Sequence, residues 1–431
     1  MSLKVWLPFI SNLNNNGLSQ NAITSYGTIA YSDSPFGKGL QFNGTSTYVT
    51  GNIYTTATMT YMCWVYFDTL RGTHLLDCRN AAGTVGYQPM YINPTSGVQV
   101  GGTTSTFIYL PYTFAASTWY HIAVTYSAIK CQLFINGVLT GETTSGKGTA
   151  LNTELPFTLG CRCSQSNFLH GKINDFRIYD HTCSVKEIAE IAKGLSLHYK
   201  LSNVSANIKD CSGYKQPASV TNVTSLADTP RYTLASKFSG SSSYIKILNN
   251  TWMGQGTRAF TINLWVYSST AWNANTHFFS CTESGGFNTE AGNSGYLRFP
   301  IHVYTDAAQT TVAYKFDSNE LKLADLPLNE WIMLTWVYDS TGTRTYINGE
   351  LHHTYTNTSY GVHFNTSARL FLGCEASGAS PTTPYYSGAM SDFRYYITAL
   401  NEKQIKELYN ESIAIDKSGN TFAREFIEVT E

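Results

Sequence analysis

The chain of 431 residues carries 28 lysines and arginines against 29 aspartates and glutamates, and this net charge of −1 predicts no broad attraction to nucleic acid or to an anionic membrane. Aromatic residues make up 14% of the chain and charged residues only 13%, a balance typical of strands and turns rather than of helices. Since domains usually hold roughly 100 to 200 residues, the length predicts two of them.

In chain order, the predicted elements occur twice. An opening strand at residues 3–9 (LKVWLPF) returns at residues 195–201 (LSLHYKL), and both have apolar residues at every second position, which predicts one buried face. The later elements return in the same order: residues 38–49 (KGLQFNGTSTYV) at 236–245 (SKFSGSSSYI), MTYMCWVY as FTINLWVY, WYHIAVTY as WIMLTWVY, the Asn136-Gly137 hairpin as Asn348-Gly349, FTLGC as LFLGC, and GKINDFRIYD as GAMSDFRYYI. The repeat predicts two tandem copies of one all-β module.

The second copy has the longer loops. Trp64 and Trp119 are 55 residues apart, whereas their counterparts Trp265 and Trp331 are 66 residues apart. The extra length falls between two predicted core strands, where binding loops are commonly built. These four tryptophans and Trp336 lie in alternating strands and are predicted to be core residues.

Each copy is predicted to close with a short helix. Ser184 and Glu187 form a capping box before one helix, and Asn401 with Gln404 opens its counterpart. The copies are therefore predicted to be domains at 1–194 and 195–410, with almost no linker between them. Residues 411–431 belong to neither copy, and their Ser-Gly-Asn turn predicts a hairpin that docks on the second domain or makes a homo-oligomer, with a flexible tail as the alternative.

The nine cysteines are odd in number and form no CxxC pair, so they are predicted to be reduced thiols, most of them buried. Cys161 and Cys163 have only His170 nearby and make a poor zinc set. The opening MSLKVWLPFI lacks the apolar region of a signal peptide, and no apolar run is long enough to span a membrane. We therefore expect a protein that is neither secreted by the common route nor inserted in a membrane.

These motifs, present twice in the same order, resemble the concanavalin A-like lectin/glucanase superfamily of the laminin-G-like type over nearly all of residues 1–410. The resemblance implies two tandem antiparallel β-sandwich domains of jelly-roll type. The junction HTCSVKEIAEIAKGLSLHYKL and the closing SIAIDKSGNTFAREFIE also resemble tail-associated proteins of phages and prophages of gut Gram-positive bacteria. This second resemblance implies a virion component made in the bacterial cytoplasm.

The sequence disfavours an enzyme. Glycosidases of the superfamily carry acidic residues that alternate on one strand, because one carboxyl protonates the leaving group while another attacks or activates water. No E-x-D-x-x-E run is present, and Asp175, Asp180 and Asp392 are isolated from one another. Asp175 and Asp392 precede Phe-Arg at matching places, which favours pairing with Arg177 and Arg394.

Sugar binding on such sandwiches uses an aromatic ring for the apolar face of a pyranose and polar side chains for its hydroxyls. The candidates in the enlarged second copy are Trp272, Phe287, Asn288, Tyr296 and Arg298, with Tyr385 and Tyr386 nearby in the motif order; the first copy offers Tyr87, Tyr91, Tyr109 and Tyr112. Some relatives also hold a structural Ca²⁺, for which Asp210 and Asp392 are the candidates in the second copy. In the first copy, the region that corresponds to Asp210 has asparagines and no acidic residue, so the prediction concerns the second copy.

Three functions remain open. The first is a non-catalytic phage or prophage adhesin that binds a cell-surface glycan for host attachment. The second is a structural virion protein whose modules contact other virion proteins. The third, a polysaccharide-active enzyme, is disfavoured by the missing carboxylate pair.

Overall fold

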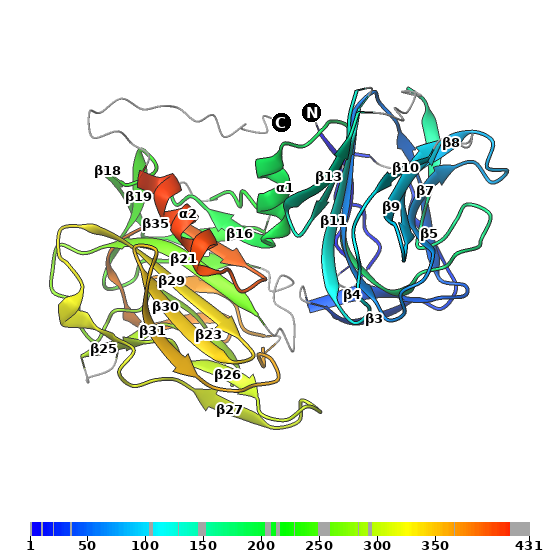
Figure 1. Cartoon of the computed structure of the whole chain (residues 1–431). Helices are drawn as coiled ribbons and strands as arrows, with labels where there is room; N and C mark the ends of the chain where they lie inside the picture. The colour runs from blue at the N-terminus through cyan, green and yellow to red at the C-terminus, as the bar shows by residue number, and fades with distance from the viewer. Residues whose placement is uncertain are drawn as a thin grey trace. The chain divides into compact units, whose positions relative to one another are not determined.

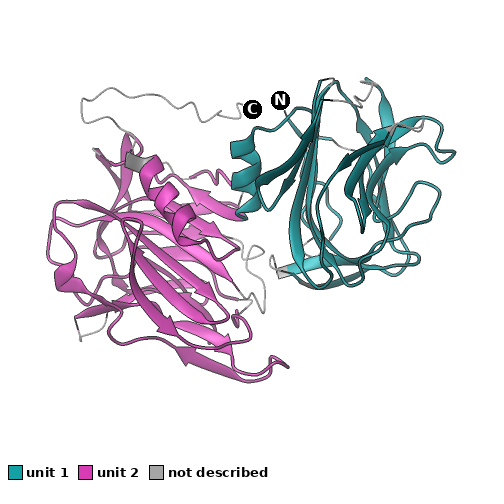
Figure 2. Ribbon diagram, viewed as in Figure 1, with its two compact units in different colours: residues 1–194 teal, residues 195–431 magenta. Residues whose placement is uncertain are grey.

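The computed structural model describes residues 2–9, 12–19, 21–34, 37–102, 107–127, 129–144, 152–202, 208–212, 216–227, 229–248, 259–282, 284–291, 295–365 and 367–413. The chain divides into two compact units, residues 1–194 and 195–431 (Figure 2). Both units are built almost wholly of antiparallel strands, as the alternation predicted. Among the described residues, no helix is both long and apolar enough to cross a membrane.

The first unit is a sandwich of two sheets (Figure 1). One sheet has the order β13 (Val138–Thr143), β12 (Cys131–Ile135), β11 (Trp119–Tyr126), β6 (Met59–Phe67), β15 (His170–Tyr179), β4 (Gly37–Asn43) and β3 (Ala30–Ser34), with β1 (Leu3–Leu7) also paired to β15. The other has the order β10 (Phe107–Leu110), β9 (Gly97–Gly102), β8 (Gly86–Asn93), β7 (Thr73–Arg79), β14 (Glu154–Leu159), β5 (Tyr48–Tyr54) and β2 (Thr24–Tyr26).

The second unit repeats this plan. Its first sheet has the order β31 (Glu350–Thr356), β30 (Gly342–Ile347), β29 (Trp331–Asp339), β21 (Phe260–Tyr267), β35 (Ser387–Tyr396), β19 (Leu234–Ser239) and β18 (Thr224–Ala227), with β16 (Leu195–Tyr199) paired to β35. Its second sheet has the order β17 (Ala218–Thr221), β20 (Tyr244–Ile247), β32 (Phe371–Leu372), β22 (Phe279–Thr282), β23 (Gly286–Asn288), β26 (Ile301–Tyr304) and β27 (Val312–Lys315). The small additions are β24 (Glu290–Ala291), β25 (Tyr296–Arg298) and β28 (Leu321–Lys322) in one sheet, the β33 (Cys374–Ser377) and β34 (Ser380–Tyr385) hairpin, and the 3-10 helix η1 (Leu323–Asp325).

The core of the first unit lies between its two sheets. Val65 and Ile122 of one sheet and Met90 and Phe157 of the other are fully buried in one apolar cluster. Because side chains alternate along a strand, the intervening residues lie on the outer faces, where binding can occur. Of the predicted core tryptophans, three are buried: Trp64, Trp265 and Trp336. Trp119 and Trp331 are half-buried, and each is the first residue of its strand.

A short helix covers the outer face of the first sheet in each unit. In the first unit, α1 (Val185–Ala192) packs through Ile188 on Met62, Ala123 and Phe134. In the second, α2 (Glu402–Ile413) packs its own apolar face on the matching sheet. Both predicted caps are present, since the Ser184 hydroxyl accepts from Glu187 N and the Asn401 amide oxygen accepts from Gln404 N. Residues 414–431, which hold most of the predicted C-terminal hairpin, lie outside the described residues.

A left-handed aspartate interrupts the matching strand of each unit. Asp175 and Asp392 have φ of 50° and 53°, at a bulge in β15 and β35, respectively. Asp175 accepts from Arg177 Nε at 2.9 Å, and Asp392 accepts from Arg394 Nε at 3.1 Å. The predicted pairing is confirmed, and it holds the bulge in both copies.

Candidate functional site

A hollow of about 550 Å³ opens on the second unit beside Trp272. Ligand pockets commonly measure roughly 300 to 1,000 Å³. The loop between β21 and β22 brings Trp272 to this hollow, β25 brings Tyr296, and the η1 segment brings Leu323. The remaining walls are Ala271, Asn273, Ala274, Gly295, Lys322, Ala324, Leu326 and Leu328. The hollow therefore combines two aromatic rings, apolar side chains, an amide and an ammonium group.

The Trp272 ring is held in place by the residues around it. Its Nε1 donates to Pro327 O at 3.1 Å, which ties the β21–β22 loop to the η1 segment. The ring also lies nearly parallel to Tyr386, at 6.4 Å between centroids, and edge-on to Phe278 at 5.9 Å. A half-buried indole with its polar atom already bonded offers its carbon surface to a ligand with little loss of freedom on binding.

A charged group lies on the same strand as Tyr296. Arg298 is two residues further along β25, so both side chains lie on one face. Glu290, directly opposite Arg298 on β24, pairs with its guanidinium and also accepts from the Tyr314 hydroxyl at 3.0 Å. Arg298 lies over the ring of Phe316 at 4.5 Å. These contacts leave Arg298 Nε buried without a hydrogen-bond partner among the described residues.

The other predicted ligand residues of the second copy lie deeper in the unit. Phe287 and Tyr386 are 0% and 1% exposed, so their rings pack the core and a surface ligand would not touch them. Asn288 is also buried, although its Oδ1 has no partner in the described part of the chain. Tyr385 is half-buried beside the small cluster of Phe371 and its neighbours. Of the predicted set, Trp272 and Tyr296 meet at one hollow and Arg298 lies beside it.

The first unit carries a row of polar and aromatic side chains on the outer face of its second sheet. Tyr109, Gln99, Tyr91 and His74 are direct cross-strand neighbours on β10, β9, β8 and β7. Tyr109 is 52% exposed, whereas His74 and Gln99 are nearly buried. His74 Nε2 lies 3.1 Å from Gln88 Oε1, and burial lowers the pKa of His74 to about 4.

His74 has a counterpart in the second unit, His277. The segment THLLDC, which holds His74, matches THFFSC, which holds His277. Burial also lowers the pKa of His277 to about 4, and in both residues Nδ1 is buried without a partner among the described residues. Aligning these six-residue segments would have predicted the pair. A neutral histidine is thus held at the start of β7 in the first copy and just before β22 in the second.

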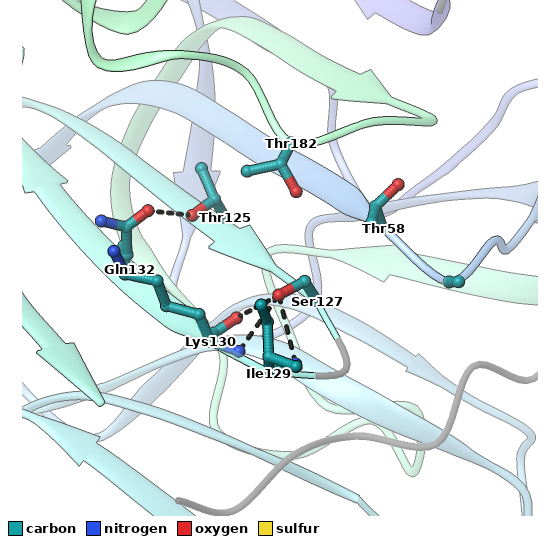
Figure 3. A pocket seen from close by; sticks show the side chains of 8 residues that line it. Thr58, Thr125, Ser127, Ile129, Lys130, Gln132 and Thr182 are labelled. Atoms are coloured by element: carbon teal, nitrogen blue, oxygen red, sulfur yellow. Dashed lines mark hydrogen bonds between the residues drawn. The ribbon is translucent and has the colours of Figure 1, made fainter. Parts of the chain in front are cut away.

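A second hollow, of about 430 Å³, lies on the first unit (Figure 3). Its walls are Ala57, Thr58, Thr125, Ser127, Ile129, Lys130, Gln132 and Thr182. Figure 3 shows the Lys130 backbone joined to Ser127 and the Gln132 side chain turned toward Thr125. Among the described residues no aromatic ring lines this hollow, so they offer no platform for a sugar ring of the kind that Trp272 provides.

The two residues predicted to hold calcium both already accept hydrogen bonds, and His198 contacts both of them. Asp392 accepts from His198 Nε2 at 2.9 Å and pairs with Arg231 at 3.2 Å, in addition to Arg394. Asp210 accepts from the backbone N–H groups of His198 and Gln216, at 2.9 and 3.0 Å. A calcium ion needs oxygen ligands and would have to displace two guanidinium groups from Asp392. This chemistry does not fit a calcium site, and calcium binding stays a prediction.

Glu320 shows what burial does to an isolated acid in this fold. It is 2% exposed and accepts from Phe299 N at 2.7 Å, from Trp336 Nε1 at 3.2 Å and from the Thr345 hydroxyl. Burial raises the pKa of Glu320 to about 7. This carboxyl lies among buried residues, and its three hydrogen bonds join different segments of the core.

A family model described as the concanavalin A-like lectin/glucanases superfamily matches residues 43–189 and 239–406, and the chain belongs to this superfamily. No curated protein matches the chain. Among solved structures, domain 4 of AbnA, a GH43 extracellular arabinanase from Geobacillus stearothermophilus in complex with arabinotriose, is 18% identical with a TM-score of 0.39, covering 50% of this chain and 98% of that domain. The botulinum neurotoxin serotype D binding domain is 16% identical with a TM-score of 0.39, covering 52% of each chain.

The binding domain of botulinum neurotoxin DC, in complex with rat synaptotagmin II, is 17% identical with a TM-score of 0.38, covering 51% of this chain and 52% of that chain. The present chain thus spans about half the length of these toxin domains.

Proposed function

We propose that the chain is a non-catalytic glycan-binding protein and that the hollow beside Trp272 holds the sugar. The observation that carries this proposal is the fixed indole ring at a ligand-sized hollow. A pyranose presents C–H groups on one face, which pack on an aromatic ring, and hydroxyls at its edge, which need polar partners. Asn273 and Lys322 supply such partners at the hollow, and both are exposed.

The contacts of Glu290 support binding rather than hydrolysis. A general acid must keep its proton near neutral pH, and a nucleophile must reach the sugar. Glu290 is instead paired with Arg298 and accepts from Tyr314. Neither Glu290 nor any other acid lines the hollow in the part of the chain that the structure describes.

We further propose that the chain is an adhesin of a phage or prophage virion, which attaches the particle to a glycan of the host surface. Support for this location comes from the resemblance of the junction at residues 181–201 and of the closing segment to tail-associated proteins. Mass spectrometry of particles induced from the host strain tests it. Recovery of the chain in purified particles supports the location, and its presence only in the lysate contradicts it.

A glycan array probed with the full chain tests the binding site itself. The wild-type chain is expected to be retained by a cell-wall or capsular glycan, Trp272→Phe to keep part of the binding, and Trp272→Ala to lose at least about tenfold, which is about 1.4 kcal/mol. Tyr109→Ala removes an exposed aromatic side chain of the first unit and serves as the matched control. Retention by Trp272→Ala equal to wild type contradicts the assignment. Silence of the wild-type chain across host glycans favours the structural virion role instead.

A further inference from the structure

Three side chains with metal-binding atoms meet at the start of α1 in the first unit. His181 Nε2 lies 3.7 Å from Cys183 Sγ and 3.9 Å from Glu187 Oε1, and all three atoms lie within 4.8 Å of one another. No other group of three or more such side chains with this closeness occurs in the described part of the chain. None of these residues takes part in the proposed glycan site.

The distances from His181 to the other two residues are close to the edges of a zinc coordination shell. With Zn–S near 2.3 Å and Zn–N and Zn–O near 2.0 to 2.2 Å, a tetrahedron has edges of about 3.4 to 3.6 Å. The two separations from His181 Nε2 exceed these values by at most about 0.5 Å, and that between Cys183 Sγ and the Glu187 carboxylate is no more than 4.8 Å. A shift of the Glu187 side chain, which is 42% exposed, would close the shell around a metal. An imidazole, a thiol and a carboxylate are all ligands that zinc takes in proteins, and a thiolate favours zinc over calcium or magnesium.

The groups around the three ligands also hold them in the orientation that a metal requires. Asp180 Oδ1 lies 3.4 Å from His181 Nδ1, the carboxylate–histidine arrangement that leaves Nε2 for a metal. Asp180 is itself fixed by the backbone N–H and hydroxyl of Ser2, at 2.6 and 2.8 Å. Glu187 Oε2 accepts from Ser184 N at 2.6 Å as part of the capping box, so its other oxygen is the one directed at His181.

The second copy shows that the fold does not need these donors. Its turn is held by the same contacts to the backbone. The Thr261 hydroxyl donates to Thr398 O and accepts from Leu400 N. In the first copy, the Thr60 hydroxyl likewise donates to His181 O and accepts from Cys183 N. The matching side chains are Ile397 for Asp180, Thr398 for His181, Leu400 for Cys183 and Gln404 for Glu187. A glutamine therefore caps the helix and a leucine fills the core position, so folding alone does not account for the donors in the first copy.

We propose that His181, Cys183 and Glu187 bind one zinc ion and that its fourth position is open to water. The Cys183 thiol lies on the inner side of the cluster at 3% exposure, whereas the Glu187 side chain is 42% exposed. Zinc displaces the thiol proton on binding, and the resulting site ties the end of β15 to the first turn of α1. The ion would thus fix the helix on the sheet that it covers.

The test uses the full chain, reduced and stripped of metal, and titrated with Co²⁺ and then with Zn²⁺. The wild-type chain is expected to give a thiolate-to-cobalt charge-transfer band that saturates at one equivalent and is bleached by zinc. The triple variant His181→Thr, Cys183→Leu and Glu187→Gln carries the residues of the second copy, which support the same turn there, and is expected to lose the band. Cys211→Ser removes an exposed thiol outside the cluster and is expected to keep it.

Metal content and thermal unfolding complete the test. Zinc is expected to raise the unfolding temperature of the wild-type chain and to leave that of the triple variant unchanged, because a ligand that binds only the folded state stabilises it. A wild-type chain that takes up no stoichiometric metal overturns the proposal. So does a triple variant that keeps the cobalt band, or a Cys211→Ser chain that loses it.

Discussion

The two halves of this molecule share a framework and differ in what it displays. The order of the sheets, the left-handed aspartate of β15 and β35, and the capped helix recur in both copies. The β21–β22 connection runs from residue 268 to 278, whereas its counterpart between β6 and β7 runs only from 68 to 72. Trp272 lies in this longer connection, and the three residues proposed to bind zinc lie in the other copy. Positions that match between copies therefore serve the fold, and positions that differ carry the specific chemistry of each copy.

The largest effect is expected at the shared aspartate. Asp392→Ala leaves the buried Arg394 without its carboxylate, which is expected to lower the free energy of unfolding of the second unit by about 3 to 5 kcal/mol. Asp175→Ala is expected to cost less, because one arginine faces Asp175 and two face Asp392. Urea unfolding followed by tryptophan fluorescence measures both.

Asp392→Asn distinguishes the loss of the negative charge from the strain in the backbone. Asparagine removes the charge but tolerates the left-handed conformation, which alanine does not. It is expected to fall between wild type and Asp392→Ala. An Asp392→Ala chain within about 0.5 kcal/mol of wild type would contradict a framework role for this residue.

A smaller change in the free energy of unfolding is expected at a strand position where the two copies carry different residues. His121 on β11 faces Trp64 and is fully buried with neither nitrogen bonded among the described residues, whereas Met333 occupies the matching place opposite Trp265. His121→Met is expected to raise the free energy of unfolding by about 1 to 2 kcal/mol at pH 7, because it removes an unsatisfied polar group. The reverse change, Met333→His, is expected to lower it.

The same pair of variants has a signature in pH. Burial lowers the pKa of His121 to about 4, while the unfolded chain keeps a histidine pKa near 6.5. Between these pH values the unfolded state binds more protons, so stability falls as the pH falls, by up to about 1.4 kcal/mol per pH unit for this residue. His121→Met is expected to flatten this part of the stability profile, and an unchanged slope would show that His121 is not titrating as a buried neutral group.

The smallest effect is expected at the helix caps. Ser184→Ala and Asn401→Ala each remove one side-chain bond to the first turn of a helix, and each is expected to cost about 1 kcal/mol. Denaturant unfolding measures both losses. Equal costs would support the equivalence of the two caps, and a cost of several kcal/mol at Ser184 in metal-free protein would contradict it.

Periodicity made most of the framework predictable from the sequence. The alternating strands, the Asn-Gly hairpins and the Ser184–Glu187 box are local patterns, and each occurs as predicted. The Asp–Arg pairs follow from the repeat, because Asp175 and Asp392 precede Phe-Arg at matching places in the two copies. Phe287 was predicted to contact a ligand but lies in the core. Adjacent residues of a strand face opposite sides, so Phe287 and Asn288 on β23 cannot both face outward.

The sites were harder to predict because they depend on contacts between distant segments. The hollow at Trp272 needs Pro327 and Leu323, more than fifty residues further along the chain, and no local pattern joins them. The His181–Cys183–Glu187 cluster is local, but its spacing is not a common zinc pattern and part of it reads as a helix cap. A residue-by-residue comparison of the two copies would have isolated both features.

The central claim is that the second copy alone carries the glycan pocket, and calorimetric titration of the full chain with the glycan selected on the array tests it most directly. The account predicts one site per chain, lost in Trp272→Ala and kept in Tyr109→Ala. Two equivalent sites per chain, or undiminished binding by Trp272→Ala, would contradict it.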